Sequence, residues 1–394
     1  MYLSQKEEGM LEGEHGEVIQ RMFRLLVRLG DIYGADKMIP VGSVQVAGVS
    51  YKSIGEPGTL FLEDIASQKA KAQVLTFLNP AGMDLENWKA LGFPEDFAKN
   101  QLRIIDAFKQ MGIVITSTCT PYLAGNLPRF REHIAWSESS AVSFSNSVIG
   151  ARTNREGGPS ALAASLCGRT PNYGLHLWEH RQPSVQVNVE ASLTNNADFG
   201  ALGYHVGKMV KNKIPYFTGI TDANTDQLKA LGAAMAASGA VALYHVEELT
   251  PEADLVEKNG LEVIAVSQQN LDETYAKLNE GTEPDIVILG CPHASLREIA
   301  TLADKVEGRH LKKPVWICTS RMMKEASDRM GFTRIIESAG GYVVADTCMV
   351  VSPIEQMGYK QTGVNSGKAA NYLPGFCKQK VVFANIDTLI EEVM

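Results

Sequence analysis

The second half of the chain alternates short runs of β-branched residues with helical segments, and this alternation restricts the fold more than any other feature. From about residue 261 onward the strand-like runs are EVIAV, DIVILG, PVWICTS, GYVVAD and KVVFAN. Helical segments such as LREIATLADKV and RMMKEASDRMGF lie between them. Strands that alternate with helices form right-handed βαβ units, which build a parallel sheet with helices on both faces. The pattern predicts an α/β fold, in which ligands bind beyond the carboxyl ends of the strands.

The first 260 residues show the same alternation less regularly. Strands are predicted over residues 73–78, 113–115, 185–189, 216–220 and 241–246. A chain of 394 residues is too long for one small core, so more than one domain is expected. We predict three α/β domains with mainly parallel sheets, made of residues 1–184, 185–260 and 261–394.

The N-terminal segment predicts a helix. Ser4 and Glu7 have the spacing of a capping box, and apolar residues then recur every three or four positions up to Gly30, which we expect to end the helix. The glycine-rich stretch at 41–58 predicts strands and tight turns rather than a helix.

Composition excludes several classes of protein. With 37 Lys and Arg against 45 Asp and Glu the net charge is −8, and no basic run is present, so no nucleic-acid partner is expected. The longest apolar stretch, residues 231–246, is too short and too interrupted to span a bilayer, so no membrane partner is expected either. Six cysteines are too few for a disulfide scaffold. We expect a cytoplasmic protein with reduced thiols.

Four of the six cysteines follow or end predicted strands, namely Cys119, Cys291, Cys318 and Cys348. Strand-end thiolates could converge on an iron–sulfur cluster, and a cubane cluster held by only three of them leaves one iron open. The alternative is that these cysteines pack as small buried hydrophobes. No C-x-x-C pair is present and no two histidines have zinc-ligand spacing, so spacing alone favours packing. His293, near Cys291, is expected to be a hydrogen-bonded structural residue.

Residues 136–155 form the densest polar segment of the chain and contain Asn146, Arg152 and Arg155. Neutral donors beside two arginines suit a small anionic ligand, and the interleaved apolar residues disfavour a fully solvated loop. The alternative is a Ser/Asn-rich turn whose side chains bond to its own backbone.

Two other segments suit an anion more weakly. Gly48, Val49 and Ser50 could bring backbone N–H groups close to it. Gly367 and Lys368 stand at the start of a predicted helix, whose dipole favours negative charge.

Taken together, several motifs resemble one family. STCTPYL, WSESSAV, NSVIGARTNR, GRTPNYGLH, GCPHAS, ADTCMV and NSGKAANYLPG occur in the order expected for aconitase X, a divergent branch of the aconitase superfamily. The similarity extends from YLSQKEEGML almost to the C-terminus. The resemblance implies an aconitase-like fold, with three α/β domains around a central cluster site, and the activity of a hydro-lyase.

The same resemblance implies an iron–sulfur cluster of the [4Fe-4S] type. It selects Cys119, Cys291 and Cys348 as ligands and leaves Cys167, Cys318 and Cys377 structural. It assigns catalysis to Glu138 and Ser139, which are also among the implied substrate contacts: Gly48, Val49, Ser50, Asn79, Pro80, Glu138, Ser139 and Lys368. Asn146, Arg152 and Arg155 are second-rank candidates that rest on chemistry more than on motif.

The resemblance also implies a partner and a small anionic substrate. Aconitase-type enzymes need a swivelling domain with a catalytic serine, and three domains already occupy this chain, so we expect a separate small subunit and a heterodimer. In the split form, archaeal members dehydrate (R)-5-phosphomevalonate to trans-anhydromevalonate 5-phosphate in an archaeal mevalonate pathway. The alternative substrate is cis-3-hydroxy-L-proline. The alternative of another class is a metal-free α/β protein that binds a small molecule.

Overall fold

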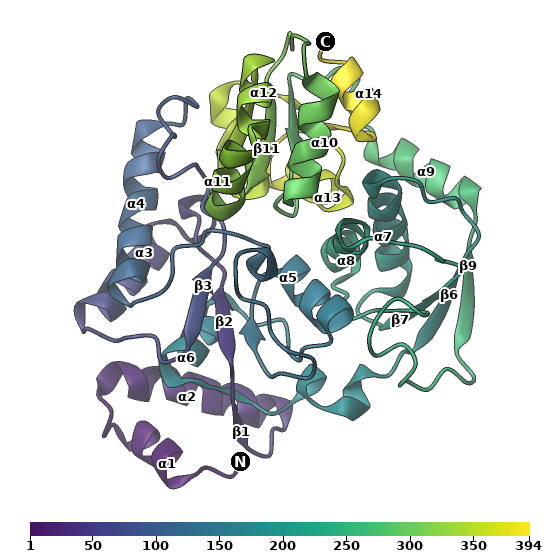
Figure 1. Ribbon diagram of the computed structural model, residues 1–394. Coiled ribbons are helices and arrows are strands. Elements are labelled where there is room, and N and C mark those ends of the chain that lie inside the picture. The colour runs from purple at the N-terminus through teal and green to yellow at the C-terminus, as the bar shows by residue number, and fades with distance from the viewer.

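The computed structural model describes residues 1–394 and contains three parallel sheets, each covered by helices (Figure 1). We refer to the three parts of the chain built around these sheets as the first, second and third units. In Figure 1 the third unit is at the top, the first at the lower left and the second at the right. None of the helices is long and apolar enough to cross a membrane.

The first unit has a parallel sheet in the order β3-β2-β4 and a small antiparallel pair, β1 with β5. Its strands are β1 (Met38–Pro40), β2 (Ser43–Val46), β3 (Leu75–Leu78), β4 (Ala135–Trp136) and β5 (Arg169–Pro171). Its helices are α1 (Gln5–Glu12), α2 (Glu17–Tyr33), α3 (Tyr51–Ser67), α4 (Glu95–Gln110), α5 (Ser139–Phe144) and α6 (Gly158–Cys167).

Three local predictions in the first unit were inaccurate. The N-terminal region forms two helices, and Gly30 lies inside α2, which ends at Gly34 in the left-handed conformation. Residues 51–67 are helical although we predicted turns, because the break at Gly55 (φ 57°) only kinks the helix. The strand expected at 113–115 is reduced to a single bridge between Val114 and Phe77. The predicted capping bond is present, since Ser4 N donates to the Glu7 carboxylate at 2.8 Å.

The second unit is a four-stranded parallel sheet in the order β8-β7-β6-β9. Its elements are β6 (Val185–Val189), α7 (Asn196–Val210), β7 (Pro215–Thr218), α8 (Thr225–Gly239), β8 (His245–Val246) and β9 (Glu262–Val266). We predicted a boundary near residue 260, but β9 lies beyond it and pairs with β6. Helix α9 (Gln268–Leu278) then leads to the third unit.

The third unit is a five-stranded parallel sheet in the order β12-β11-β10-β13-β14. Its strands are β10 (Ile286–Leu289), β11 (Val315–Thr319), β12 (Gly341–Ala345), β13 (Gln361–Val364) and β14 (Lys380–Phe383). Its helices are α10 (Leu296–Val306), α11 (Arg321–Met330), α12 (Phe332–Ser338), α13 (Gly367–Cys377) and α14 (Ile386–Glu391).

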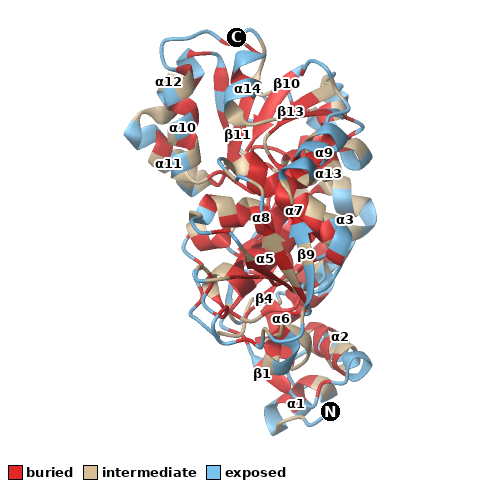
Figure 2. Cartoon of the chain, turned by 90° about the vertical axis from the view of Figure 1, so that its right-hand side faces the viewer, coloured by how far each residue is buried: buried red, intermediate tan, exposed pale blue.

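Helices cover both faces of the third sheet, as its near-continuous apolar strands require. Ile288 and Trp316 point to the face covered by Leu373 of α13, whereas Val287 points to the face covered by Leu302 of α10. The first of these clusters continues into α7 and α8, so the second and third units share one core. Figure 2 shows this buried interior running through the middle of the molecule.

Candidate active site

The polar loops of the first and third units lie where the strand order of each sheet reverses. In the first sheet the loops after β2 and β4 flank this point, and in the third sheet the loops after β10 and β13 do so. In open α/β sheets the crevice outside the carboxyl ends at such a switch point is the usual ligand site. The two crevices are bordered by residues that the sequence had singled out: Gly48, Val49, Ser50, Glu138 and Ser139 in the first, and Cys291 and Lys368 in the third.

A buried ion pair joins the two crevices. Lys368, in the first turn of α13, donates from Nζ to Glu138 Oε1 and to Ser140 Oγ, the latter at 3.1 Å. Glu138 caps α5, because its carboxylate accepts from Ala141 N at 2.8 Å, from Ser140 Oγ at 2.6 Å and from Ser139 Oγ at 3.3 Å. Burial opposes ionisation of Glu138, but the charge of Lys368 holds its pKa below the ordinary value. Burial likewise opposes the lysine charge, but Glu138 raises the pKa of Lys368. Both side chains therefore stay charged.

The loop after β2 is shaped for close approach to the third unit. Gly48 has φ 81°, a left-handed conformation that favours glycine. Val49 is held through its carbonyl, which accepts from Gln101 Nε2 at 2.9 Å. Ser50 caps α3 and donates from Oγ to Val351 O at 2.8 Å, so this turn is tied to the segment just after Cys348.

The loop after β3 lies against the loop that carries Cys348. Ala81, directly after Pro80, bridges to this loop, and Cys348 N donates to Ala81 O at 3.0 Å. Asn79 Oδ1 and Ser117 Oγ are buried without any hydrogen-bond partner in the protein. A buried polar atom without a partner is costly, so each of these two oxygens lacks a hydrogen bond that the protein alone does not supply.

Three of the six free cysteines gather around the ion pair. The charges of Glu138 and Lys368 act on each of Cys119, Cys291 and Cys348, which come from three different strand-end loops. Burial raises the pKa of Cys291 to about 12 and also raises the pKa of Cys119 and of Cys348.

The donor set of these three loops is thiol sulfur, the ligand type that iron–sulfur clusters use. No group of three or more His, Cys, Asp and Glu side chains could hold one metal ion. Because each thiolate of an iron–sulfur cluster binds a different iron, its ligands stand farther apart than those of a single ion. Three thiols on three loops, with the Glu138 carboxylate already paired to Lys368, fit a cluster held by three cysteines.

The other three cysteines lie in packed interiors. Cys167 ends α6 within the core of the first unit, and Cys318 is buried within β11. We expected Cys377 in a loop, but it is the last residue of α13 and its Sγ contacts Val350 O at 3.2 Å.

The segment 136–155 is divided between the site and a structural network. Asn146 donates from Nδ2 to Thr153 O at 2.9 Å, and its Oδ1 accepts from Arg181 at 3.2 Å. Arg152 donates to His176 O at 3.1 Å, and Arg155 is exposed. Asn146 is thus engaged within the protein and Arg155 faces solvent, whereas Arg152 Nε is buried without a hydrogen-bond partner. The anion site predicted around these three residues stays a prediction.

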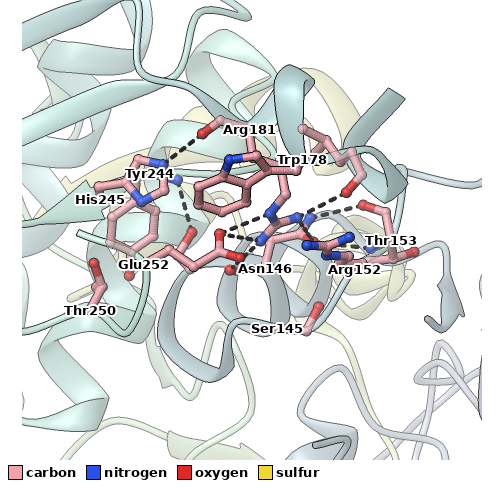
Figure 3. A network of polar contacts seen from close by, with 12 residues as sticks. Ser145, Asn146, Arg152, Thr153, Trp178, Arg181, Tyr244, His245, Thr250 and Glu252 are labelled. Atoms are coloured by element: carbon pink, nitrogen blue, oxygen red, sulfur yellow. Dashed lines mark hydrogen bonds and ion pairs between the residues drawn. The ribbon is translucent and has the colours of Figure 1, made fainter. Parts of the chain in front are cut away.

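The centre of this network is a buried arginine that the sequence did not single out (Figure 3). Arg181 is fully buried and pairs with Glu252 at 2.8 Å, and its carbonyl accepts from His245 at 2.9 Å. No local motif marks these residues, since Glu252 lies 71 positions from Arg181.

Comparison with known proteins identifies the relatives of the chain. Three family models match in order: the aconitase X first domain at residues 1–179, the second domain at 183–276 and the third domain at 284–394. A phosphomevalonate dehydratase large subunit of Methanocaldococcus jannaschii is 55% identical over 99% of this chain and 100% of the relative. A protein of the same description from Methanothermobacter thermautotrophicus is 50% identical, with 99% and 98% covered.

A more distant relative is longer than this chain. The cis-3-hydroxy-L-proline dehydratase of Pseudomonas aeruginosa is 33% identical, and the similarity covers 98% of this chain but 68% of that protein. Among solved structures, the crystal structure of Thermococcus kodakaraensis aconitase X in its holo-form matches with a TM-score of 0.95 and 47% identity, covering 100% of both chains. The fold predicted from the sequence is confirmed, and the chain belongs to the aconitase X family.

Proposed function

We propose that this chain is the large subunit of a hydro-lyase that dehydrates (R)-5-phosphomevalonate to trans-anhydromevalonate 5-phosphate, as a step of an archaeal mevalonate pathway. The observation that carries the proposal is the difference between two groups of relatives. Large subunits of phosphomevalonate dehydratase match over 95–100% of their own length at 34–55% identity, whereas the longer cis-3-hydroxy-L-proline dehydratases match over 68% of theirs at 31–33%.

The proposed cofactor is an iron–sulfur cluster, of the [4Fe-4S] type, held by Cys119, Cys291 and Cys348. Hydroxide is a poor leaving group, and when bound the cluster supplies a Lewis acid for the departing hydroxyl. Six free thiols are consistent with a reducing cytoplasm.

The residues of the chain would bind and orient the substrate. Lys368 Nζ is a buried cation that can neutralise a carboxylate or phosphate as a point charge. Asn79 Oδ1 offers a free acceptor to a substrate hydroxyl, and the turn at Gly48 offers backbone N–H groups to an anion. Glu138 keeps Lys368 charged and, with Ser139, would orient the hydroxyl or carboxylate of the substrate.

The proposed partner is a small swivelling-domain subunit that carries the catalytic serine. That serine would take the proton from the carbon next to the hydroxyl. The description "large subunit" of the end-to-end relatives supports a two-subunit enzyme. The alternative class, a metal-free binding protein, is disfavoured because the end-to-end relatives are described as subunits of a dehydratase.

The experiment is anaerobic reconstitution of the chain with iron, sulfide and the small subunit, followed by parallel assays on 5-phosphomevalonate and cis-3-hydroxy-L-proline. We expect dehydration of the first substrate only, and only with both subunits present. Full activity of the isolated chain would contradict the two-subunit enzyme, and turnover of hydroxyproline alone would contradict the substrate.

The ligand set is tested separately by serine variants. Cys291→Ser should abolish the visible absorbance of the cluster and the activity, whereas Cys167→Ser, at a buried thiol of α6, should keep both. Equal iron content in the two variants would reject the ligand assignment, and absence of iron from the wild-type protein would reject the proposed cofactor.

A further inference from the structure

One buried histidine contacts the segments of all three proposed ligand cysteines. His293 is 1% exposed and lies in the loop between β10 and α10, two residues after Cys291. Its backbone N–H donates to Cys119 Sγ at 3.2 Å. Its ring nitrogens reach Thr118 Oγ1 at 3.0 Å, next to Cys119, and Thr347 O at 2.9 Å, next to Cys348.

The partners determine which ring nitrogen carries the proton. A carbonyl oxygen only accepts, so Nε2 of His293 must donate to Thr347 O. In the neutral ring Nδ1 then accepts from the hydroxyl of Thr118, whose Oγ1 in turn accepts from Thr120 N at 3.1 Å. Nε2 is thus the donor to the loop of Cys348, and Nδ1 is the acceptor from the loop of Cys119. The imidazole ring connects these two loops.

The backbone of His293 is held from the opposite side by the second unit. Lys229 of α8 donates from Nζ to His293 O at 3.2 Å. Lys229 is itself buried and paired with Asp226 at 3.1 Å and with Glu298. The loop of Cys291 is therefore fixed between the cysteine loops on one side and a buried charged group on the other.

From this geometry we infer that His293 is a positioning residue for the cluster, which holds the loops of Cys119, Cys291 and Cys348 at the separation that the three ligands need. The inference rests on the cluster in the proposed function. The three loops are far apart in sequence, since the contacts of His293 span 174 and 54 residues, so local structure cannot set their spacing. Partners that orient metal ligands typically contribute about 10- to 100-fold to metal affinity.

The test compares substitutions that each keep one of the two ring contacts. His293→Asn retains a polar atom near the Nδ1 position, His293→Gln retains one near the Nε2 position, and His293→Ala retains neither. Thr118→Val removes the hydroxyl partner of Nδ1 with little change of shape. This variant tests the same contact if the histidine variants fold poorly. His245→Gln is the matched control, because His245 is 0% exposed and likewise donates from Nε2 to a carbonyl, Arg181 O at 2.9 Å, in the second unit.

The measurements are iron and sulfide per chain after anaerobic reconstitution, the rate of iron loss to a chelator, and the visible circular dichroism of the cluster. We expect iron loss about 10- to 100-fold faster for His293→Ala, with intermediate rates for the Asn and Gln variants and a changed dichroism per bound iron. Thr118→Val should change the rate of iron loss and the dichroism per bound iron in the same direction. In the cluster-free protein, amide exchange should accelerate at residues 116–120 and 346–349 of the His293 variants. His245→Gln should match the wild type in all of these measurements.

The outcomes separate this inference from the proposed function. A wild-type chain that binds iron, with His293 and Thr118 variants that lose it at the wild-type rate, would overturn the inference and leave the function standing. An equal acceleration in His245→Gln would also overturn it, because any buried histidine would then have the same effect. A wild-type chain that binds no iron would overturn the proposed cofactor itself.

Discussion

The buried pair of Glu138 and Lys368 allows a prediction with a direction and a magnitude. In Lys368→Met the Glu138 carboxylate keeps its bonds from Ala141 N and Ser140 Oγ, or it can take up a proton. For a carboxyl of ordinary pKa 4.5, protonation at pH 7 costs about 3 kcal/mol. In Glu138→Gln the buried ammonium keeps Ser140 Oγ, and loss of its proton from an ordinary pKa of 10.5 costs about 5 kcal/mol.

We therefore expect Glu138→Gln to destabilise the cluster-free protein by about 5 kcal/mol and Lys368→Met by about 3 kcal/mol, within the usual range for breaking a buried pair. The double variant leaves no buried charge and should cost less than either single change, about 2 kcal/mol or less. The assay is urea unfolding of the cluster-free chain at pH 7, followed by tryptophan fluorescence. The control is Arg21→Met, which breaks a pair whose side chains are 43% and 49% exposed and should leave the unfolding midpoint nearly unchanged. Additive losses in the double variant would refute the reasoning.

Two further predictions concern packing and pH. Gly367→Ala should lower the urea midpoint of unfolding and displace Lys368, because the added Cβ would lie 2.4 Å from Gly200 O. Gly375→Ala in the same helix is the control: its Cβ would meet no atom within 4 Å, so the change should be neutral or stabilising. Burial lowers the pKa of His176 to about 3 and that of His245 to about 4. Because the unfolded chain binds these protons more tightly, the free energy of unfolding should be constant above about pH 6.5 and fall as the pH drops, by about 2 kcal/mol per histidine at pH 5. Urea midpoints at pH 7.5 and pH 5 measure this loss, and His245→Gln should remove its share; a midpoint independent of pH would contradict it.

The sequence predicted those parts of the fold whose signals are local. The apolar runs of the third unit all became parallel strands, and the strand-end rule directed attention to the loops that border the two crevices. The prediction of turns was wrong for residues 51–58, because glycine and proline occur in turns but also at helix kinks and in first helical turns. The glycines of residues 41–58 suggested turns, but Gly55 only kinks α3, and Pro57 lies just after the kink, where a first helical turn tolerates proline.

Long-range contacts were not predictable from one sequence. Asn146 was assigned to an anion site because it lies near Arg152 and Arg155 in the sequence, and no local pattern indicates its hydrogen bond with Arg181, 35 residues away. His293 was correctly expected to be hydrogen-bonded, but its partners at Thr118 and Thr347 are 175 and 54 residues distant. The selection of Cys119, Cys291 and Cys348 came from the family resemblance and not from spacing, and it stays a prediction until iron is measured.

Each pair of units is connected by buried or partly buried charged or polar contacts, and this bears on how the site could close. Glu138 with Lys368, and Asp84 with Arg321 at 2.7 Å, connect the first unit to the third. Lys229 with Glu298 connects the second to the third. Asn146 with Arg181, and Arg181 with Glu252, connect the first to the second. Separating the third unit from either of the others would leave charges unpaired, which for a fully buried pair costs about 3–5 kcal/mol. Separating the first unit from the second would break the buried hydrogen bonds of Arg181 to Asn146, so the three units should move as one body. In the proposed enzyme, closure over the substrate would then have to come from the small subunit.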